Sequence, residues 1–232
     1  MARLADGPFD LVIFDLDGVL VDSEPISARV TAAALTEAGI EISAADACER
    51  FLGVSTGSML LAIEAEHGRR LPAGFQETLR TRVLKAFEHE LAPVAGVPAL
   101  LDALSLPRCV ASSSHPDRIR RSLELVGLLD RFMPDLFSAT MVERGKPAPD
   151  LFLLAAARMA ADPARCLVVE DSEVGVRAGK AAGMTVFGFA GASHVRHATH
   201  APRLEAAGAD AVFAEMTALV GLLEGRATWR MP

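Results

Sequence analysis

Two carboxylates, Asp15 and Asp17, stand two residues apart in the segment Asp-Leu-Asp-Gly, directly after the apolar run 10–14. A short β-branched run bounded by turn residues is typical of a buried parallel strand, and ligands of open α/β sheets bind outside the carboxyl ends of strands. Two acids at such a position can share one hard cation, and one of them can attack an electrophile that the cation holds. A plain Asp-Gly turn would also explain the segment.

Serine hydroxyls and a lysine occupy two later positions of the same kind. Ser112 and Ser113 follow a second apolar run, 109–111, and precede a helical stretch that begins at Pro116. A serine hydroxyl and free N–H groups at a helix start can bind an anion, although N-capping alone also accounts for serines there. Lys146 precedes a stiff Pro-Ala-Pro segment. A lysine held there can neutralise a phosphoryl group and a carboxylate together, or it can be a solvated turn residue.

The last cluster is the acidic pair Glu170 and Asp171, which follows the apolar run 167–169. Two consecutive carboxylates after a buried strand cost free energy unless they are solvated, paired or bound to metal. The four clusters are expected to converge on one edge of a sheet. Together they would supply a nucleophile, a second acid, a hydroxyl, a cation and further metal ligands, which is the equipment for phosphoryl transfer through an aspartate.

The elements that must position these residues follow from hydrophobic patterning. Apolar runs alternate with helical stretches, and this alternation predicts an α/β fold with a doubly wound parallel sheet. The predicted strands lie at 10–14, 109–111, 167–169, 185–189 and 211–213, and the predicted helices between them at 98–104, 116–126, 149–160, 174–182 and 216–223.

The segment 24–91 breaks this alternation, because it contains no convincing strand. Four helical patterns fit it instead, at 25–38, 44–51, 56–67 and 74–90, with glycines between them as expected helix ends. We therefore expect a helical insert after the first strand.

Composition excludes several classes of protein. The net charge is −7, with 30 acidic and 23 basic residues and no polybasic run, so neither nucleic-acid nor membrane-surface binding has electrostatic support. Three scattered cysteines form no disulfide framework or metal-binding spacing. Residues 1–9 lack the apolar core of a signal peptide, and no apolar stretch approaches the length of a membrane span. We expect a cytoplasmic protein.

The four motifs, taken in order with their spacing, resemble the haloacid dehalogenase (HAD) superfamily. The most similar members are phosphatases with a helical cap inserted after the first motif, in the β-phosphoglucomutase-like and phosphogluconate-phosphatase-like branches. The resemblance covers 9–223. It implies a Rossmann-like core formed by 1–23 and 93–232 and an all-helical cap formed by 24–92.

The resemblance also implies roles for the motif residues. Asp15 would be the nucleophile, and Asp17 the general acid/base. Ser112 would hydrogen-bond the phosphoryl oxygens, and Lys146 would pair with Asp15 and the transferring group. The reaction would pass through an aspartyl phosphate, so the chain is expected to be a phosphoric monoester hydrolase.

A magnesium site is implied by the same resemblance. Asp15 and Asp171 would ligate Mg²⁺ through their carboxylates, and Asp17 through its backbone carbonyl. Glu170 would lie beside them, as a direct ligand or through water. Oxygen ligands with open water positions favour Mg²⁺ over zinc.

The substrate is expected to be a small phosphorylated metabolite, a sugar phosphate or sugar-acid phosphate, with 6-phosphogluconate as the specific candidate. Ser113 of the core and Gly53, Ser55 and Thr56 of the insert are the predicted substrate-binding residues. We expect a monomer or weak dimer.

Two other functions stay open. In a hexose-phosphate mutase of the β-phosphoglucomutase type, a histidine and two cap cations stand where this chain has Ser27, Leu52 and Thr56, so a second phosphate would lack charged partners here. A non-catalytic receiver-like protein, phosphorylated on Asp15, would need neither Asp17 nor the insert. The residues His194, His197 and His200 recur every third position, and we interpret them as part of a solvated loop.

Overall fold

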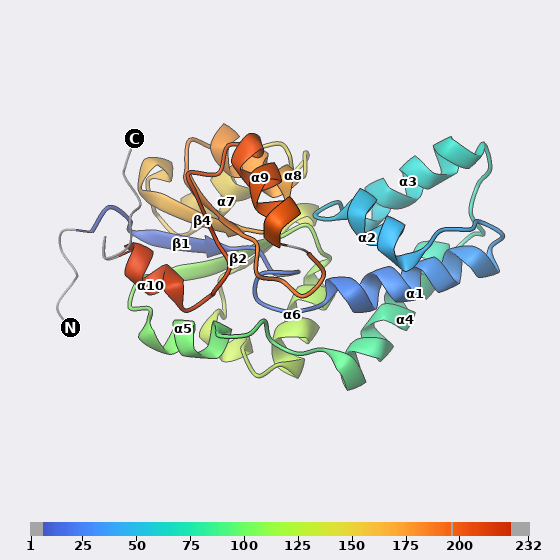
Figure 1. Cartoon of the computed structure of the whole chain (residues 1–232), viewed down its shortest axis with the longest axis horizontal. Helices are drawn as coiled ribbons and strands as arrows, with labels where there is room; N and C mark the ends of the chain where they lie inside the picture. Colours follow the sequence, from blue (N-terminus) through green and yellow to red (C-terminus); the bar gives the residue numbers. More distant parts are fainter. Residues whose placement is uncertain (1–6, 196, 224–232) are drawn as a thin grey trace.

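The structure, a computed structural model, describes residues 7–195 and 197–223 (Figure 1). Within these residues a six-stranded parallel sheet has the order β3-β2-β1-β4-β5-β6. The chain therefore starts in the centre, winds outward on one side and then returns to wind outward on the other. The strands are β1 (Leu11–Phe14), β2 (Arg108–Ser112), β3 (Leu136–Ser138), β4 (Cys166–Glu170), β5 (Thr185–Phe189) and β6 (Ala211–Phe213). The predicted doubly wound α/β fold is confirmed.

Helices cover both faces of the sheet because the strands are apolar on both sides. All four residues of β1 are buried, and alternate side chains enter different clusters: Val12 and Phe14 one, Leu11 and Ile13 the other. Helices α5 (Val97–Ala103), α6 (Pro116–Leu125) and α10 (Ala218–Leu223) pack on the first face, and α7 (Asp150–Arg158), α8 (Glu173–Ala181) and α9 (His197–Ala207) on the second. Short 3₁₀ turns are η1 (Leu129–Arg131), η2 (Ala139–Met141) and η3 (Pro163–Arg165).

Four helices form a separate body beside the carboxyl ends of the strands, drawn in blue to green on the right of Figure 1. They are α1 (Glu24–Glu37), α2 (Ala44–Phe51), α3 (Thr56–His67) and α4 (Phe75–Glu90). The Ser43 and Ser55 hydroxyls cap α2 and α3 by accepting hydrogen bonds from the backbone N–H groups three residues on. The helices bury a hydrophobic core of their own, which includes Leu35, Ile63 and Phe87. We keep 24–92 as the proposed bounds of this cap.

Two neighbouring linkers join the cap to the core. The Asp22 N–H donates to the Ala92 carbonyl over 2.9 Å, and the Val94 N–H donates to the Leu20 carbonyl over 3.0 Å. The chain therefore enters and leaves the cap at one place on the core.

Besides the short 3₁₀ turns, one strand and one α-helix of the described residues were absent from the sequence prediction. Strand β3 has only three residues, too few for a pattern of period two to stand out. Helix α9 contains Pro202 and several small residues, so its apolar stripe is weak. Among the described residues, no helix combines the length and apolar character needed to cross a membrane.

Gly179 of helix α8 faces the sheet and leaves no room for a side chain there. A Cβ built at Gly179 would lie 2.6 Å from Val186 Cγ2 and 3.5 Å from Val168 Cβ. Both valines are fully buried and stiff about χ1, so neither side chain can move aside cheaply.

We predict that Gly179→Ala lowers the free energy of unfolding by about 1–3 kcal/mol, even though alanine favours helix formation over glycine by about 1 kcal/mol. Urea denaturation measures this effect. Gly221→Ala, in α10, is the matched control, because nothing lies within 4 Å of a Cβ there. It should leave stability unchanged or raise it, and equal behaviour of the two variants would contradict the close packing.

Candidate active site

The register of the central strands brings three predicted clusters to one edge of the sheet. Phe14 of β1 pairs with Val110 of β2 and Val169 of β4, so the next residue, Asp15, lies between the ends of both neighbours. The Asp15 N–H continues the ladder by donating to the Val169 carbonyl over 3.0 Å. Asp15 thus stands at the point where the winding of the sheet reverses, which is where ligands of this architecture bind.

Lys146 connects these strand ends. Its Nζ donates to Asp15 Oδ1 over 2.8 Å, to Glu170 Oε1 over 2.6 Å and to the Ala111 carbonyl over 3.1 Å. Only 1% of its side chain is exposed, and the ammonium lies 4.8 Å from the centroid of the Phe152 ring. Burial alone would lower the pKa of Lys146, but the two carboxylates raise it, so the lysine stays charged.

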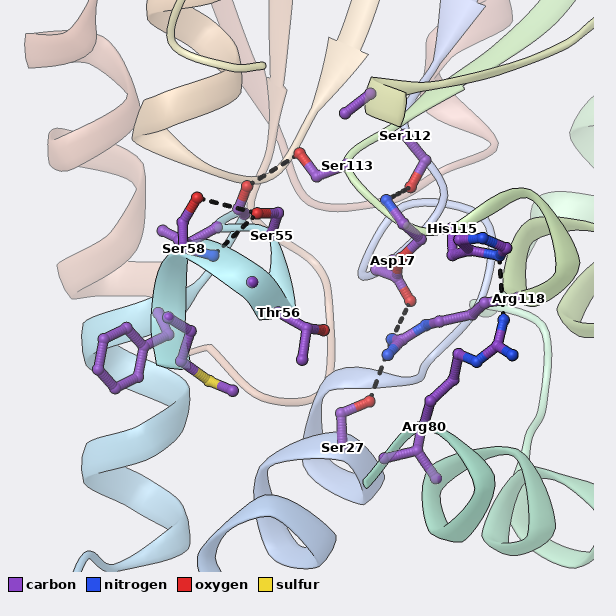
Figure 2. Close-up of a pocket in the computed structure, with 18 of the residues that line it drawn as sticks. Asp17, Ser27, Ser55, Thr56, Ser58, Arg80, Ser112, Ser113, His115 and Arg118 are labelled. Carbon is purple, nitrogen blue, oxygen red and sulfur yellow. Dashed lines mark hydrogen bonds and ion pairs between the residues drawn. The ribbon is translucent and has the colours of Figure 1, made fainter. Parts of the chain in front are cut away.

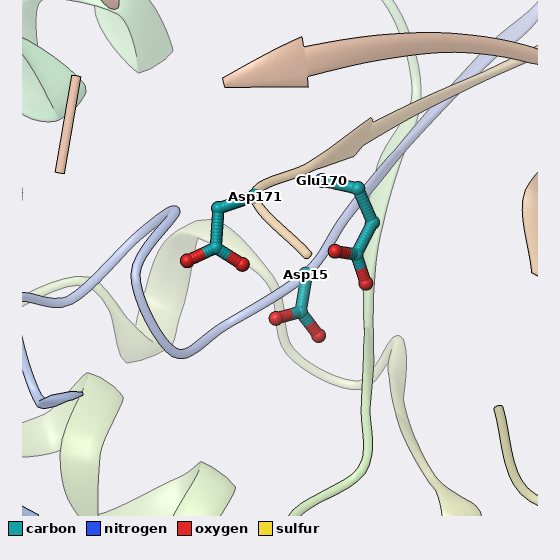
Figure 3. Close-up of side chains that lie close together, drawn as sticks. All are labelled: Asp15, Glu170 and Asp171. Carbon is teal, nitrogen blue, oxygen red and sulfur yellow. The ribbon is translucent and has the colours of Figure 1, made fainter. Parts of the chain in front are cut away.

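Three buried carboxylates, Asp15, Glu170 and Asp171, lie close together (Figure 3). Lys146 donates to two of them. Each offers one oxygen, and these oxygens lie within 4.8 Å of one another. Burial raises the pKa of Asp15 to about 7, with Glu170 and Asp17 adding to the rise and Lys146 opposing it. Burial likewise raises the pKa of Asp171 well above its usual range, again with Glu170 and Asp15 adding to the rise. One ammonium cannot neutralise three carboxylates, so the cluster has spare negative charge.

The carboxylate oxygens of this cluster differ in the number of hydrogen bonds that they accept. Glu170 is occupied, because Oε1 accepts from Lys146 and Oε2 accepts from the Ser172 N–H and hydroxyl, each over 2.9 Å. Asp171 Oδ2 is buried and accepts no hydrogen bond from any described residue. Gly18, with φ of +78°, lets the first loop approach that oxygen, because a Cβ there would lie 1.9 Å from Asp171 Oδ2.

This donor set fits a divalent magnesium ion. All the donors are carboxylate oxygens, the cluster has spare negative charge, and Asp171 Oδ2 accepts no hydrogen bond from the described chain. Asp15 and Asp171 are the residues most available to hold the ion, since protein groups already occupy Glu170.

Asp17 lies apart from this cluster and makes different contacts. Its Oδ1 accepts from the Ser23 hydroxyl over 2.5 Å and from Arg118 Nη2 over 2.6 Å, and its Oδ2 accepts from the Ser114 hydroxyl over 2.7 Å. Burial alone would raise the pKa of Asp17, but Arg118 and the two serines hold it below its usual range. Both oxygens of Asp17 therefore already accept hydrogen bonds from the protein.

A cavity of about 1080 Å³ lies between the cap and the core, and Asp15, Asp17 and Lys146 line it. Figure 2 shows part of its lining, from Asp17 of the core to Thr56 of the cap. The core contributes Ser112 and Ser113, and the cap contributes Gly53, Ser55 and Thr56. The buried Ser112 hydroxyl accepts from the Ser114 N–H over 3.1 Å, and the Ser113 hydroxyl donates to the Gly53 carbonyl over 3.2 Å. All predicted substrate-binding residues thus line one cavity, and the loop before α3 contacts the core there.

The interpretation of the histidines as a solvated loop is wrong for two of them. His200 is buried on α9, with Nε2 2.5 Å from the Asp171 carbonyl oxygen. The His194 side chain is 2% exposed, with Nε2 3.5 Å from Asp171 Oδ2, and burial lowers its pKa to about 4. The chain turns between the two residues and brings both to Asp171. His197 begins α9, and its side chain lies outside the described residues.

Sequence reasoning also missed several residues that line the cavity, among them Glu24, Arg80 and Arg118. Burial raises the pKa of Glu24 to about 8, with Asp17 adding to the rise and Arg118 opposing it. Arg80, from α4, donates to Glu77 over 2.9 Å and to Asp117 over 3.1 Å. No local pattern marks Glu24 or Arg118 as a site residue, and the i, i+3 pair of Arg80 with Glu77 is typical of any exposed helix face.

A protein-family model for haloacid dehalogenase-like hydrolases matches residues 9–183. The chain belongs to this family. The 6-phosphogluconate phosphatase of Escherichia coli (strain K12) is 34% identical to this HAD-like hydrolase over 192 residues, which cover 82% of the chain and 87% of that enzyme. The expected resemblance and the expected class of enzyme, a phosphoric monoester hydrolase, are confirmed, and the receiver-like alternative is wrong.

Solved structures agree with this family assignment. A haloacid dehalogenase-like protein of unknown function from Agrobacterium tumefaciens is 41% identical, with a TM-score of 0.80, and the match covers 94% of this chain and 99% of that one. A HAD family hydrolase from Deinococcus radiodurans, solved with bound phosphate and sodium, is 33% identical, with a TM-score of 0.74 and coverage of 95% and 97%.

From the carboxylate cluster we predict that the free energy of unfolding depends on pH in the absence of a divalent cation, and that Mg²⁺ removes this dependence. Asp15 has a pKa of about 7 in the folded chain and an ordinary value of 3.8, so the folded state binds more protons between these values. Without a divalent cation, the free energy of unfolding should therefore fall as the pH rises from about 4 to about 7. Mg²⁺ should reverse the loss, because it binds the ionised native cluster.

Urea denaturation at several pH values, in EDTA and in Mg²⁺, measures this effect. Asp171→Asn should show a smaller fall in EDTA and a smaller gain from Mg²⁺. Identical curves with and without Mg²⁺ for the unaltered protein would contradict the metal assignment.

Proposed function

We propose that this HAD-like hydrolase is an Mg²⁺-dependent phosphatase that hydrolyses a small phosphorylated metabolite through an aspartyl phosphate on Asp15. One observation carries the proposal: a buried carboxylate at the reversal point of the sheet is paired with a buried lysine and opens into the cavity. A carboxylate so placed can reach a phosphoryl group, and the lysine reduces the repulsion between the two anions.

The first half of the reaction forms the aspartyl phosphate. Mg²⁺, when bound, would supply positive charge to the phosphoryl oxygens and to the Asp15 carboxylate. Asp15 attacks phosphorus in line, while Lys146 and the Ser112 hydroxyl bind the phosphoryl oxygens. Asp17 takes up a proton from solvent when the substrate binds, and it gives this proton to the departing alcohol.

The second half of the reaction returns the enzyme to its starting state. Asp17, now a carboxylate, takes a proton from the water that attacks the aspartyl phosphate, which releases phosphate and Asp15. The hydrogen bonds that hold Asp17 as a carboxylate suit this second role.

The substrate class proposed is a sugar phosphate or sugar-acid phosphate, and 6-phosphogluconate is the first candidate. The cavity volume of about 1080 Å³ accommodates a hexose-sized leaving group, and serine, threonine and carboxyl groups line it. Such groups hydrogen-bond hydroxyls well. Relatives named for 6-phosphogluconate and hexitol phosphates point the same way. We also keep the cytoplasm as the proposed compartment and a monomer or weak dimer as the proposed state.

A sugar-phosphate mutase is the second candidate, and the charges around the cavity disfavour it. A mutase must bind a second phosphate with cations of the cap. In the cap, whose residues 24–92 are all described, Arg80 is the cation that reaches the cavity, and Glu77 and Asp117 already engage it. A second phosphate would have to displace these carboxylates.

We predict that Asp15→Asn lowers phosphate release by at least about 10³-fold without unfolding the chain, because an amide does not attack phosphorus. Phosphate release from a panel of sugar phosphates in Mg²⁺ measures this effect. Asp10→Asn is the matched control, since Asp10 lies at the opposite end of β1 and pairs with the exposed Arg165. If Asp15→Asn, in preparations free of the wild type, kept more than a few per cent of the wild-type activity, this result would contradict the assignment of Asp15 as the nucleophile.

Phosphatase and mutase activities are separated by their products. With β-glucose 1-phosphate and Mg²⁺, we expect inorganic phosphate, no glucose 6-phosphate, and no stimulation by glucose 1,6-bisphosphate. ³¹P NMR follows all three species at once. If glucose 6-phosphate accumulated faster than phosphate, the mutase would become the preferred function.

A further inference from the structure

The proposed mechanism leaves Arg118 without a role, although it lies inside the site. Arg118 is the third residue of α6, and only 15% of its side chain is exposed (Figure 2). Burying a guanidinium costs free energy unless close partners compensate. The partners of Arg118 therefore indicate what the residue does.

One partner of Arg118 is the acid/base residue. Its Nη2 donates to Asp17 Oδ1 over 2.6 Å, while the Ser23 and Ser114 hydroxyls donate to the same carboxylate. The three donors come from α6, the linker into the cap, and the loop after β2. Asp17 is thereby held from three sides, and Arg118 is the charged member of the three.

The other partners of Arg118 belong to the cap. The same Nη2 donates to the Ser27 hydroxyl of α1 over 3.1 Å, and the guanidinium carbon lies 5.0 Å from the centroid of the Phe87 ring of α4. Phe87 is 1% exposed and belongs to the hydrophobic core of the cap. A displacement of the cap would therefore move the guanidinium or break its contacts, and either change would act on Asp17.

We propose that Arg118 is a positioning residue that ties the direction of the Asp17 carboxylate to the position of the cap. The inference rests on the proposed function, in which Asp17 protonates the leaving alcohol. When the cap has the position that it has in this structure, the hydrogen bonds from Arg118 and the two serines keep the Asp17 carboxylate directed toward the leaving oxygen. Without Arg118, Asp17 is free to turn away from the leaving oxygen.

The test compares leaving groups, because only poor ones need an acid. An alkyl leaving group departs as the alcohol and needs a proton from Asp17, whereas p-nitrophenolate departs as the anion and needs none. The alkyl ester is 6-phosphogluconate, or glucose 6-phosphate if the wild type hydrolyses glucose 6-phosphate faster. We expect Arg118→Met to lower kcat/KM about 100-fold for the alkyl ester and less than about 5-fold for p-nitrophenyl phosphate. The ratio kcat/KM is used because it reports the step in which the leaving group departs.

Two conservative variants keep the test decisive. Arg118→Lys retains the charge but replaces the planar fork with one ammonium, so we expect a loss of about 10-fold for the alkyl ester. Ser27→Ala removes only the cap hydroxyl and should produce a smaller loss with the same preference for the alkyl ester. Thermal denaturation of each variant reports whether it is folded.

The matched control is Arg121→Met, on the next turn of α6. Arg121 also joins α6 to α4, through Glu88 over 3.3 Å, but it is exposed and does not contact Asp17. It should change both substrates equally and little. Equal losses on both esters in Arg118→Met and Arg118→Lys, or no loss in either, would overturn this inference while leaving the phosphatase intact. No phosphate release by the wild type from any ester would overturn the proposed function, and the inference with it.

Discussion

The contact between Lys146 and the carboxylates of Asp15 and Glu170 is the interaction on which the site depends. Each group would be unstable alone in the interior, since a charge without a partner is costly to bury. Together they join the loop before α7 to the ends of β1 and β4. The lysine also reaches the Ala111 carbonyl at the end of β2, so one ammonium connects three adjacent strands. The position of the proposed nucleophile is set by this shared cation.

Lys146 does not neutralise the three carboxylates completely, and the remaining negative charge accounts for the groups that surround Glu170 and Asp171. Three carboxylates face one ammonium, so two of them keep raised pKa values. Ser172 supplies further donors to Glu170, but no hydrogen-bond donor from the described part of the chain reaches Asp171 Oδ2. Uncharged His194 stands nearby and His200 binds the Asp171 backbone, which fixes this residue while leaving its carboxylate available to a cation.

Much of this arrangement could be predicted from the sequence, because it depends on local patterns. Apolar runs that end in polar residues marked the strands β1, β2 and β4, and a parallel sheet brings such ends together. The contacts of Arg118 and His200 could not be predicted in this way. Each depends on how a helix is rotated against the sheet and on how far a side chain reaches. Strand β3 was missed for another reason: its three residues owe their extended conformation to pairing with β2.

The paired linkers at 20–22 and 92–94 make the cap an insertion with adjacent ends. Since the chain leaves and rejoins the core at neighbouring, hydrogen-bonded positions, the winding of the sheet does not depend on what lies between them. The core carries the residues of the proposed chemistry, whereas the cap contributes much of the lining of the cavity. The sequences of the cap and the core can therefore diverge at different rates during evolution. A new substrate specificity can arise from changes in the cap alone, while the core keeps the same reaction.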